Sequence, residues 1–324
     1  MSATRFSLLA FCLFCSSNSL ARETFTISYG GVSAFQAPVW AAKDLGLLDK
    51  YGLDAEVIMI PGSSRGIQAL IGRSTHFAQG DGPAAMNARL QGADLVIIAG
   101  SLNKFPFSMV VQQNIRQPSD LIGKKIGIVN FGGSNELAVV SALKEWGIPR
   151  QSITLLPSGS ASSRLAALST GALDATVLAP PETTKAKQMG LSLLADLSDL
   201  KARFPLNVIM TRRDFLEKNR ETVKRFLQAF SEGIHMLATD KNKALGVYAR
   251  RLKLQDNALL SDTVKFFSGK FSNPPRVDRQ GMENAVELIS QKTTIGKIKN
   301  LISEVLDETL INELEAEGFF RKLK

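Results

Sequence analysis

The chain is poor in the residues that most enzymes use for nucleophilic or metal chemistry. It has only two cysteines and two histidines among 324 residues. Both cysteines, Cys12 and Cys15, lie in an N-terminal apolar stretch that we expect the mature protein to lose. Each follows a phenylalanine, where a lipidation site would have a small residue. A mature chain without cysteine has no disulfide, thiolate nucleophile or zinc–sulfur site. We therefore expect no catalytic residues, no metal site and no cofactor.

The N-terminal apolar run is too short to anchor the protein in a membrane. It reads "FSLLAFCLFC", follows Arg5 and precedes the small-residue stretch "SSNSLA". A helix that spans a bilayer needs roughly 20 apolar residues. A basic residue, a short apolar run and small residues before a cleavage point are typical of a secretory signal peptide. We expect residues 1–21 to be that signal, and export of a mature protein that begins at Arg22.

The chain has an excess of basic residues, with a formal net charge of +9 at pH 7. Such an excess is compatible with nucleic acid, a membrane surface or an acidic partner. However, the charges alternate in sign along stretches with helical periodicity, as in "RRDFLEKNRETVKRF". This pattern favours solvated helix surfaces, so we expect no nucleic-acid partner.

Short apolar runs alternate with helical patterns through the first two thirds of the chain. Strands are predicted near residues 24–29, 54–60, 75–79 and 94–100, and the pattern restarts after an extended stretch at residues 105–113. β-branched runs between helices are typical of parallel sheets covered on both faces. After the stretch "LNVIMTRRDF", which ends at residue 215, only helical patterns remain. The apolar stripe of residues 222–238 is typical of a helix packed on a core.

One small unit occurs twice, about a hundred residues apart. "GSSRGIQALIGRSTHFAQGDGPAA" begins at Gly62 and "GSASSRLAALSTGALDATVLAPPE" begins at Gly159. Each predicts a loop, a helix, a short joint, a strand and a further helix opened by proline, which is favoured in the first helical turn. We interpret the pair as equivalent parts of two α/β lobes. In such sheets ligands bind outside the carboxyl ends of the strands, so the loops of both lobes would face one cleft.

Glycine and small polar residues fill the predicted strand-to-helix loops. Glycine lets the backbone approach a ligand, and helix N-termini attract anions or polar groups. Ser63, Ser134 and Ser162 could bind a ligand, or could simply be helix N-caps; the sequence leaves both open.

Two other features have ordinary structural explanations. The segment "GDGPAA" formally matches a dinucleotide fingerprint, but the following strand does not end in the required acidic residue. His76 lies in an apolar strand, where we expect a structural role.

Several stretches resemble the periplasmic solute-binding proteins of ABC importers in the nitrate, sulfonate and taurine group, which are related to thiamine-precursor synthases. They include "FQAPVWAAKDLGLLDKYGLDAEVIMIPG", "GDGPAAMNARLQGADLVIIAG" and "PSDLIGKKIGIVNFGGSNELAVVSALKEWGI". The resemblance implies an α/β type II periplasmic-binding-protein fold with a C-terminal helical segment. Lobe 1 would comprise residues 22–112 and 207–324, and lobe 2 residues 113–206.

The resemblance also implies positions in the cleft. Carried over to this sequence, and extended to the adjacent Gly82 and Asn135, the candidate ligand-binding residues are Ser33, Phe35, Gln36, Ser63, Ser64, Asp81, Gly82, Gly133, Ser134, Asn135 and Glu182. We expect the two connecting segments, near residues 110–113 and 206–210, to act as a hinge.

The function that follows from the resemblance is solute capture rather than catalysis. The expected partners are a small molecule, an ABC permease and its ATPase, with the protein acting as a monomer in the periplasm. A pyrimidine-forming enzyme of the same fold is an alternative, but those enzymes carry a cysteine cluster and iron-binding histidines that this chain lacks. A sensor that presents its ligand to a receptor is another.

The residues give a first indication of the solute. Asp81 and Glu182 are the expected carboxylates of the cleft, and Phe35 would supply an apolar wall. Arg65 and Arg164 are expected to point into solvent, as most surface arginines do. These residues predict a small organic solute, of zwitterionic character, rather than an inorganic anion such as nitrate.

Overall fold

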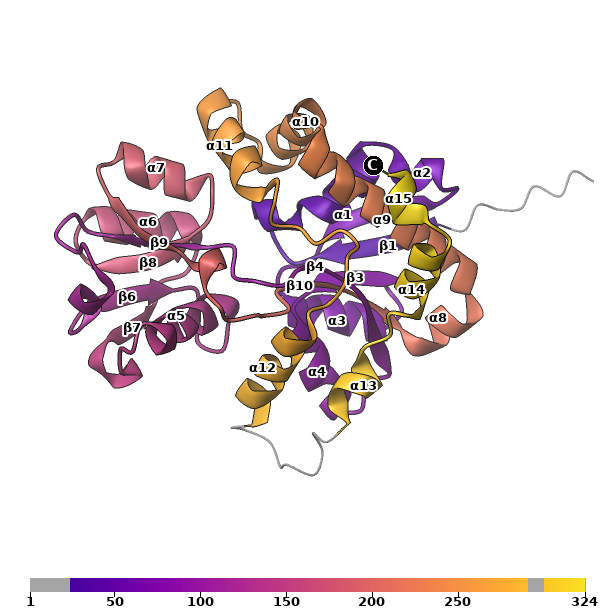
Figure 1. Ribbon diagram of the computed structural model, residues 1–324, viewed down its shortest axis with the longest axis horizontal. Coiled ribbons are helices and arrows are strands. Elements are labelled where there is room, and N and C mark those ends of the chain that lie inside the picture. The colour runs from indigo at the N-terminus through magenta and orange to yellow at the C-terminus, as the bar shows by residue number, and fades with distance from the viewer. Residues whose placement is uncertain (1–23, 291–299, 324) are drawn as a thin grey trace, which may run out of the picture.

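The computed structural model describes residues 24–290 and 300–323, and two five-stranded sheets organise them (Figure 1). The first sheet has the strand order β2-β1-β3-β10-β4 and the second has the order β7-β6-β8-β5-β9. The first sheet comprises β1 (Thr24–Tyr29), β2 (Asp54–Met59), β3 (Phe77–Gly80), β4 (Leu95–Leu102) and β10 (Asn207–Arg212). The second comprises β5 (Ser108–Val111), β6 (Lys125–Ile128), β7 (Thr154–Pro157), β8 (Ala175–Leu178) and β9 (Ser192–Asp196).

The two sheets follow the same plan, which accounts for the repeated sequence unit. In each sheet the strand of that unit, β3 or β8, lies third, beside a parallel neighbour. The fourth strand, β10 or β5, is antiparallel and enters from the other lobe. The chain therefore crosses between the lobes twice, once before β5 and once before β10.

The first crossover lies earlier in the chain than we expected. β5 pairs with β8 and β9, so residues 108–111 belong to the second sheet and not to lobe 1. The connecting segments are consequently residues 103–107 and 200–206. They run together, since the Leu206 N–H donates to the Leu102 carbonyl at 3.0 Å and the Phe204 N–H to the Asn103 carbonyl at 2.9 Å. The expected hinge segments near 110–113 and 206–210 instead lie largely inside sheets.

Helices cover both sheets, and the C-terminal part of the chain is helical (Figure 1). In sequence order up to β10 the α-helices are α1 (Ala37–Asp44), α2 (Leu47–Lys50), α3 (Ser63–Ile71), α4 (Gly82–Leu90), α5 (Ser134–Glu145), α6 (Ala161–Ser169) and α7 (Glu182–Gln188). After β10 come α8 (Arg213–Lys218), α9 (Arg220–Thr239), α10 (Lys241–Leu252), α11 (Asn257–Phe267), α12 (Arg279–Ser290), α13 (Leu301–Val305), α14 (Thr309–Ala316) and α15 (Phe319–Lys322). As expected, no strand follows β10 in the described residues. The edge strand β9 was not predicted, because its half-buried residues alternate weakly.

Helix α9 forms much of the first lobe's core. The six apolar residues of its predicted stripe are all buried: Val223, Phe226, Leu227, Phe230, Ile234 and Leu237. The ring of Phe226 stacks on that of Phe77 in β3, with centroids 4.1 Å apart. The stripe is therefore core, as its periodicity indicated. His76 is structural as well, since its Nδ1 accepts a hydrogen bond from the Thr26 N–H at 3.1 Å.

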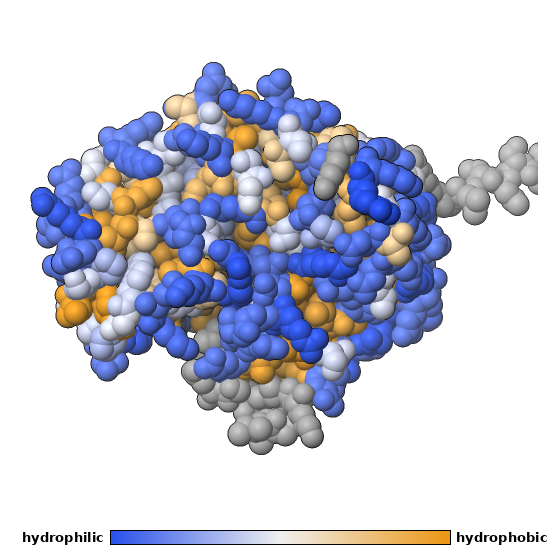
Figure 2. Space-filling view, in the orientation of Figure 1, coloured by the Kyte–Doolittle hydropathy of each residue, from blue (hydrophilic) through white to orange (hydrophobic). Residues whose placement is uncertain are grey.

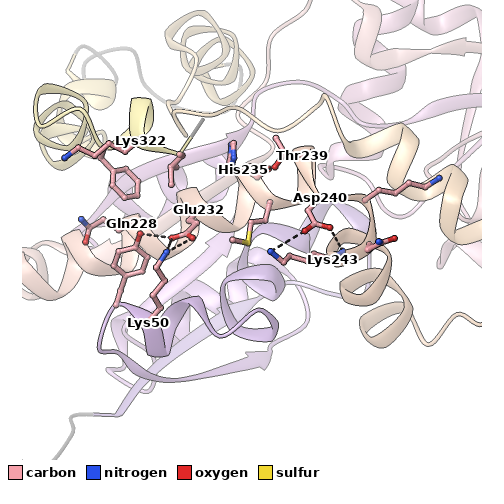
Figure 3. A pocket seen from close by; sticks show the side chains of 14 residues that line it. Lys50, Gln228, Glu232, His235, Thr239, Asp240, Lys243 and Lys322 are labelled. Atoms are coloured by element: carbon pink, nitrogen blue, oxygen red, sulfur yellow. Dashed lines mark hydrogen bonds and ion pairs between the residues drawn. The ribbon is translucent and has the colours of Figure 1, made fainter.

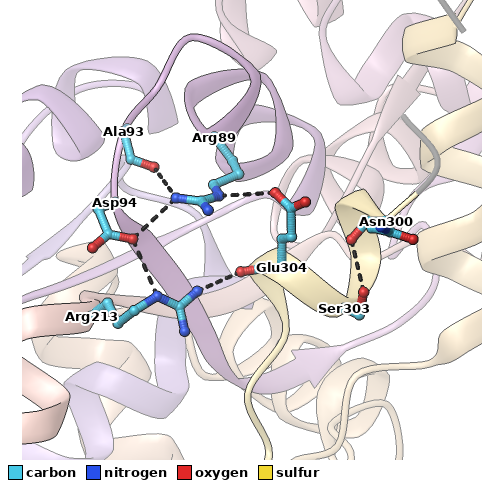
Figure 4. Close-up of polar contacts among 7 residues, drawn as sticks. All are labelled: Arg89, Ala93, Asp94, Arg213, Asn300, Ser303 and Glu304. Atoms are coloured by element: carbon cyan, nitrogen blue, oxygen red, sulfur yellow. Dashed lines mark hydrogen bonds and ion pairs between the residues drawn. The ribbon is translucent and has the colours of Figure 1, made fainter. Parts of the chain in front are cut away.

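The C-terminal helices pack on the first lobe, to which the resemblance assigned residues 207–324. Figure 4 shows polar contacts that join α13 to this lobe. Arg213 donates to the Glu304 carbonyl at 2.6 Å and to Asp94 Oδ1 at 3.2 Å, and Arg89 lies 3.0 Å from Asp94 Oδ1. These groups are mostly exposed, so they contribute little stability and mainly fix the path of the chain. Buried Val305 and Ile311 supply the apolar contact.

The basic residues lie largely on the outer surface, as the alternating charges indicated. Figure 2 shows hydrophilic side chains over most of the face in view, with smaller apolar patches between them.

Candidate functional site

Two adjoining cavities lie between the lobes and together form one cleft. The first chamber has a volume of about 1030 Å³, and the second chamber about 380 Å³. Both are lined by residues of each lobe, and they share Ser33, Phe35, Val129, Ser134 and Asn135. The loops after β1 and β6 therefore form the boundary between the chambers.

The structure brings ten of the eleven candidate residues to this cleft. The nine that line the first chamber are Ser33, Phe35, Gln36, Ser63, Ser64, Asp81, Gly133, Ser134 and Asn135. Glu182 lines the second chamber instead. Their position fits a binding role, and whether each contacts a solute stays a prediction.

Gly82 is the exception, because it packs on a crossover segment. Its N–H donates to the Pro205 carbonyl at 2.8 Å. A Cβ at this position would lie 2.5 Å from Pro205 Cγ. Glycine is therefore required here by close packing, and Gly82 does not line either chamber.

Ser63, Ser134 and Ser162 are not helix N-caps. The N-cap positions of α3, α5 and α6 are occupied by Gly62, Gly133 and Ser160. The Ser63 hydroxyl instead accepts a hydrogen bond from the Asp81 N–H at 3.2 Å, which ties the α3 loop to the α4 loop. The hydroxyls of Ser134 and Ser162 make no hydrogen bond with the described part of the chain. They remain available at the walls of the cleft.

Asp81 has a structural role at the start of α4. Its Oδ1 accepts from the Ala84 N–H at 2.9 Å, so it is the N-cap of this helix. Because an N-cap uses one carboxylate oxygen, the other oxygen of Asp81 could still accept a hydrogen bond from a solute.

A buried amide lies where the two chambers meet. Asn135 lies in the first turn of α5 and is only 5% exposed. Its Oδ1 makes no hydrogen bond to the described residues. A buried polar atom without a partner is costly, typically by about 1–3 kcal/mol. Since Asn135 lines both chambers, a bound solute or water could supply the missing partner.

Arg164 is the main residue that sequence reasoning misplaced. It is 3% exposed and lines the second chamber rather than pointing into solvent. Its Nε donates to Thr176 Oγ1 at 3.1 Å, one Nη to the Gly159 carbonyl at 2.5 Å and the other to the Val177 carbonyl at 3.1 Å. Burial lowers the pKa of Arg164 to about 10, against the opposing influence of the Glu182 charge.

The repeated unit contains the signal for this burial. Arg164 precedes the buried Leu168 by four residues, whereas Arg65 precedes the buried Leu70 by five. At about 100° per residue, a spacing of four puts Arg164 on the core face of α6, and a spacing of five turns Arg65 away from it. Arg65 is exposed as expected, although it borders the first chamber.

Apolar residues form the other wall of the second chamber. Phe35 meets Phe107 edge to face, with ring centroids 6.3 Å apart. Leu252 and Leu254, at the end of α10, line the same chamber. The expected apolar wall at Phe35 is thus larger than one side chain.

A separate cavity of about 810 Å³ lies on the first lobe, away from the cleft (Figure 3). At its base the buried carboxylate of Glu232 accepts from Lys50 Nζ at 2.7 Å and from the Tyr51 hydroxyl at 2.7 Å. Burial and the neighbouring Glu232 raise the pKa of Tyr51. These groups satisfy one another, so the cavity is a weaker candidate than the cleft.

Two kinds of site are not found in residues 24–290 and 300–323. No group of three or more histidine, cysteine, aspartate or glutamate side chains is arranged to hold a metal ion there. None of the helices in this part of the chain combines the length and apolar character needed to cross a bilayer.

Two α/β lobes with a cleft between them define the periplasmic-binding-protein fold, and solved structures of that class match this chain. The family model described as NMT1/THI5 like matches residues 34–244, and the chain belongs to that family.

Sequence relatives of the chain carry names that indicate binding. A protein of Brucella abortus, whose name assigns it only a binding role, is 24% identical over 265 residues, which are 80% of this chain and 82% of that protein. The taurine-binding periplasmic protein of Escherichia coli is 29% identical over 152 residues, 46% of this chain and 47% of its own.

The crystal structure of the periplasmic aliphatic sulphonate-binding protein SsuA of Escherichia coli has the same fold. It superposes with a TM-score of 0.71 at 21% identity, covering 83% of this chain and 91% of SsuA. The likeness at this identity concerns the fold alone.

Proposed function

We propose that the mature chain is a periplasmic solute-binding component of an ABC import system. It captures a small polar organic solute, of sulfonate-, taurine- or pyrimidine-like character, in the cleft between its lobes. It then presents the solute to a membrane permease that is driven by an ATPase, and it acts as a monomer. The relatives named for taurine and aliphatic sulphonate binding support this proposal.

The observation that carries the proposal is the composition of the cleft. Its walls come from strand-to-helix loops of both lobes, and they contain hydroxyls and an amide oxygen that make no hydrogen bond with the described residues. Glycine at the N-caps of α3 and α5 leaves the first N–H groups of those helices near the cleft. Groups of this kind recognise polar parts of a solute without chemistry.

The proposed motion is a closure of the lobes about the two crossovers, residues 103–107 and 200–206. Extended segments can absorb changes in φ and ψ while each sheet stays rigid. A solute shifts the population toward the closed state only if it contacts both lobes, and residues of both lobes line each chamber.

The direct test is a thermal-shift screen of purified residues 22–324 against sulfonates, taurine, nitrate, amines, pyrimidines and aromatic acids. A specific solute at 100 times its dissociation constant should stabilise the protein by about 2.7 kcal/mol. Small-angle scattering with that solute should show a smaller radius of gyration. Absence of any stabilising solute, or an unchanged radius with solute bound, would contradict the proposal.

Export and the role in transport need their own tests. N-terminal sequencing of the native protein should find Arg22 first, and an intact Met1 would contradict export. A sensor would use the same cleft but would act through a receptor. If this chain serves transport, cells that lack it should fail to grow on the identified solute. If it serves sensing, they should still grow.

A further inference from the structure

Charge is distributed unequally between the two chambers. Arg65 and Asp81 are the charged side chains of the first chamber, and they balance. The second chamber has Arg164, Lys185 and Glu182, which leaves one positive charge in excess. Lys185 Nζ lies 3.9 Å from Glu182 Oε1, so this carboxylate already has a cationic neighbour.

Arg164 has no carboxylate in direct contact, although the charge of Glu182 acts on it from a greater distance. No carboxylate oxygen of the described residues lies within 4.0 Å of it, and its three hydrogen bonds go to two carbonyls and one hydroxyl. A guanidinium has five N–H donors, so two remain after these bonds. A buried charge is costly unless an opposite charge compensates it.

The surroundings of Arg164 combine this cation with apolar surface. Phe35, Phe107 and Leu254 line the same chamber, and so does Ser162, whose hydroxyl makes no hydrogen bond with the described residues. Planar guanidinium groups bind oxyanions through paired hydrogen bonds. Apolar walls favour an organic body over a fully hydrated ion.

We propose that the second chamber is a subsite for the oxyanion head of an organic anion, which Arg164 binds while Phe35 and Phe107 contact the apolar body. This inference rests on the proposed function, and it replaces Asp81 with Arg164 as the residue that selects the solute. A chemical class follows: sulfonates or carboxylates that carry an apolar group.

The test is calorimetric titration of residues 22–324 with four probes of similar length: pentanesulfonate, hexanoate, pentylamine and pentanol. The sulfonate, the carboxylate or both should bind at least tenfold more tightly than the amine and the alcohol. Nitrate, which lacks an apolar body, should bind more weakly than the organic anions. Equal or tighter binding of the amine or alcohol, or no binding of either anion, would overturn the inference.

Variants locate the interaction. Arg164→Gln should weaken binding of the anion by on the order of 10- to 100-fold, the usual effect of removing a hydrogen bond to a charged group. The matched control is Arg150→Gln in the same lobe, where the arginine donates to the Ile153 carbonyl outside both chambers and the affinity should not change. Unchanged affinity in a folded Arg164→Gln protein would refute the subsite.

A second variant covers the case in which Arg164→Gln does not fold. Glu182→Gln removes the negative charge of the chamber and leaves Arg164 in place, so anion affinity should rise by roughly two- to tenfold. Unchanged or lower affinity would also refute the subsite. If the thermal-shift screen instead finds only neutral or cationic solutes that compact the protein, the proposed function stands and the anion subsite falls.

Discussion

Asp81 combines two roles that a pair of substitutions can separate. Its Oδ1 caps α4 through the Ala84 N–H at 2.9 Å, and its side chain also lines the first chamber. Asp81→Ala removes the cap and the charge together. Asp81→Asn keeps an oxygen that can accept the same hydrogen bond, since asparagine is as good an N-cap as aspartate, and removes only the charge.

Loss of an N-cap typically costs about 1 kcal/mol, within a range of roughly 0.5–2 kcal/mol. The hydrogen bond from the Asp81 N–H to Ser63 Oγ uses the backbone, so both variants keep it. We therefore expect Asp81→Ala to lower the free energy of unfolding by about 1 kcal/mol, and the melting temperature by about 2 °C. Asp81→Asn should remain within about 0.5 kcal/mol of the wild type.

Urea unfolding of residues 22–324 without solute measures the cap, and titration with the identified solute measures the contact. If the Asp81 carboxylate accepts a hydrogen bond from the solute, both variants should bind it more weakly by about 1–3 kcal/mol. Equal destabilisation by the two substitutions would refute the capping argument. Wild-type affinity in Asp81→Asn would remove Asp81 from the list of solute contacts.

Three further predictions concern stability. Gly82→Ala should lower the free energy of unfolding, measured by urea titration, by about 1–3 kcal/mol, because the new methyl would lie 2.5 Å from Pro205 Cγ. An unchanged free energy would show that the crossover segment moves to accommodate the methyl. Phe226→Ala should cost about 3–5 kcal/mol by the same measurement, since its fully buried ring leaves a cavity, and a loss below 1 kcal/mol would contradict the packing. A hydrogen bond from Arg73 lowers the pKa of Asp214. The ionised Asp214 side chain therefore stabilises the folded protein at pH values above the usual carboxyl pKa of about 4. That contribution is lost progressively as the pH falls below this value. Asp214→Asn should accordingly have a lower urea midpoint than the wild type at pH 7, and the difference should be smaller at pH 3. A difference independent of pH would contradict this.

The local pattern of the sequence was enough to predict the α/β alternation, the two equivalent lobes and the buried stripe of α9. These features depend on residues within one or two turns of each other, because the period of apolar residues reports which face of an element is covered. Ten of the eleven candidate residues line the cleft, because the strand-to-helix loops of such sheets lie on one side.

Tertiary structure decided the features that depend on contacts between distant segments. β5 joins the second sheet because β8 and β9 offer it pairing partners on both sides, which its own sequence does not show. Gly82 is required for packing only because Pro205, which is far away in the sequence, contacts it in the folded protein.

The burial of Arg164 depends both on a local sequence pattern and on contacts between distant segments. Its spacing from Leu168 was present in the sequence and placed it on the core face of α6, but a charged side chain is normally assigned to the surface. Only the folded protein supplies the carbonyls of Gly159 and Val177 and the hydroxyl of Thr176 that accept its hydrogen bonds. A charge can be buried where such partners converge, and that convergence is a property of the tertiary structure because the partners come from different elements.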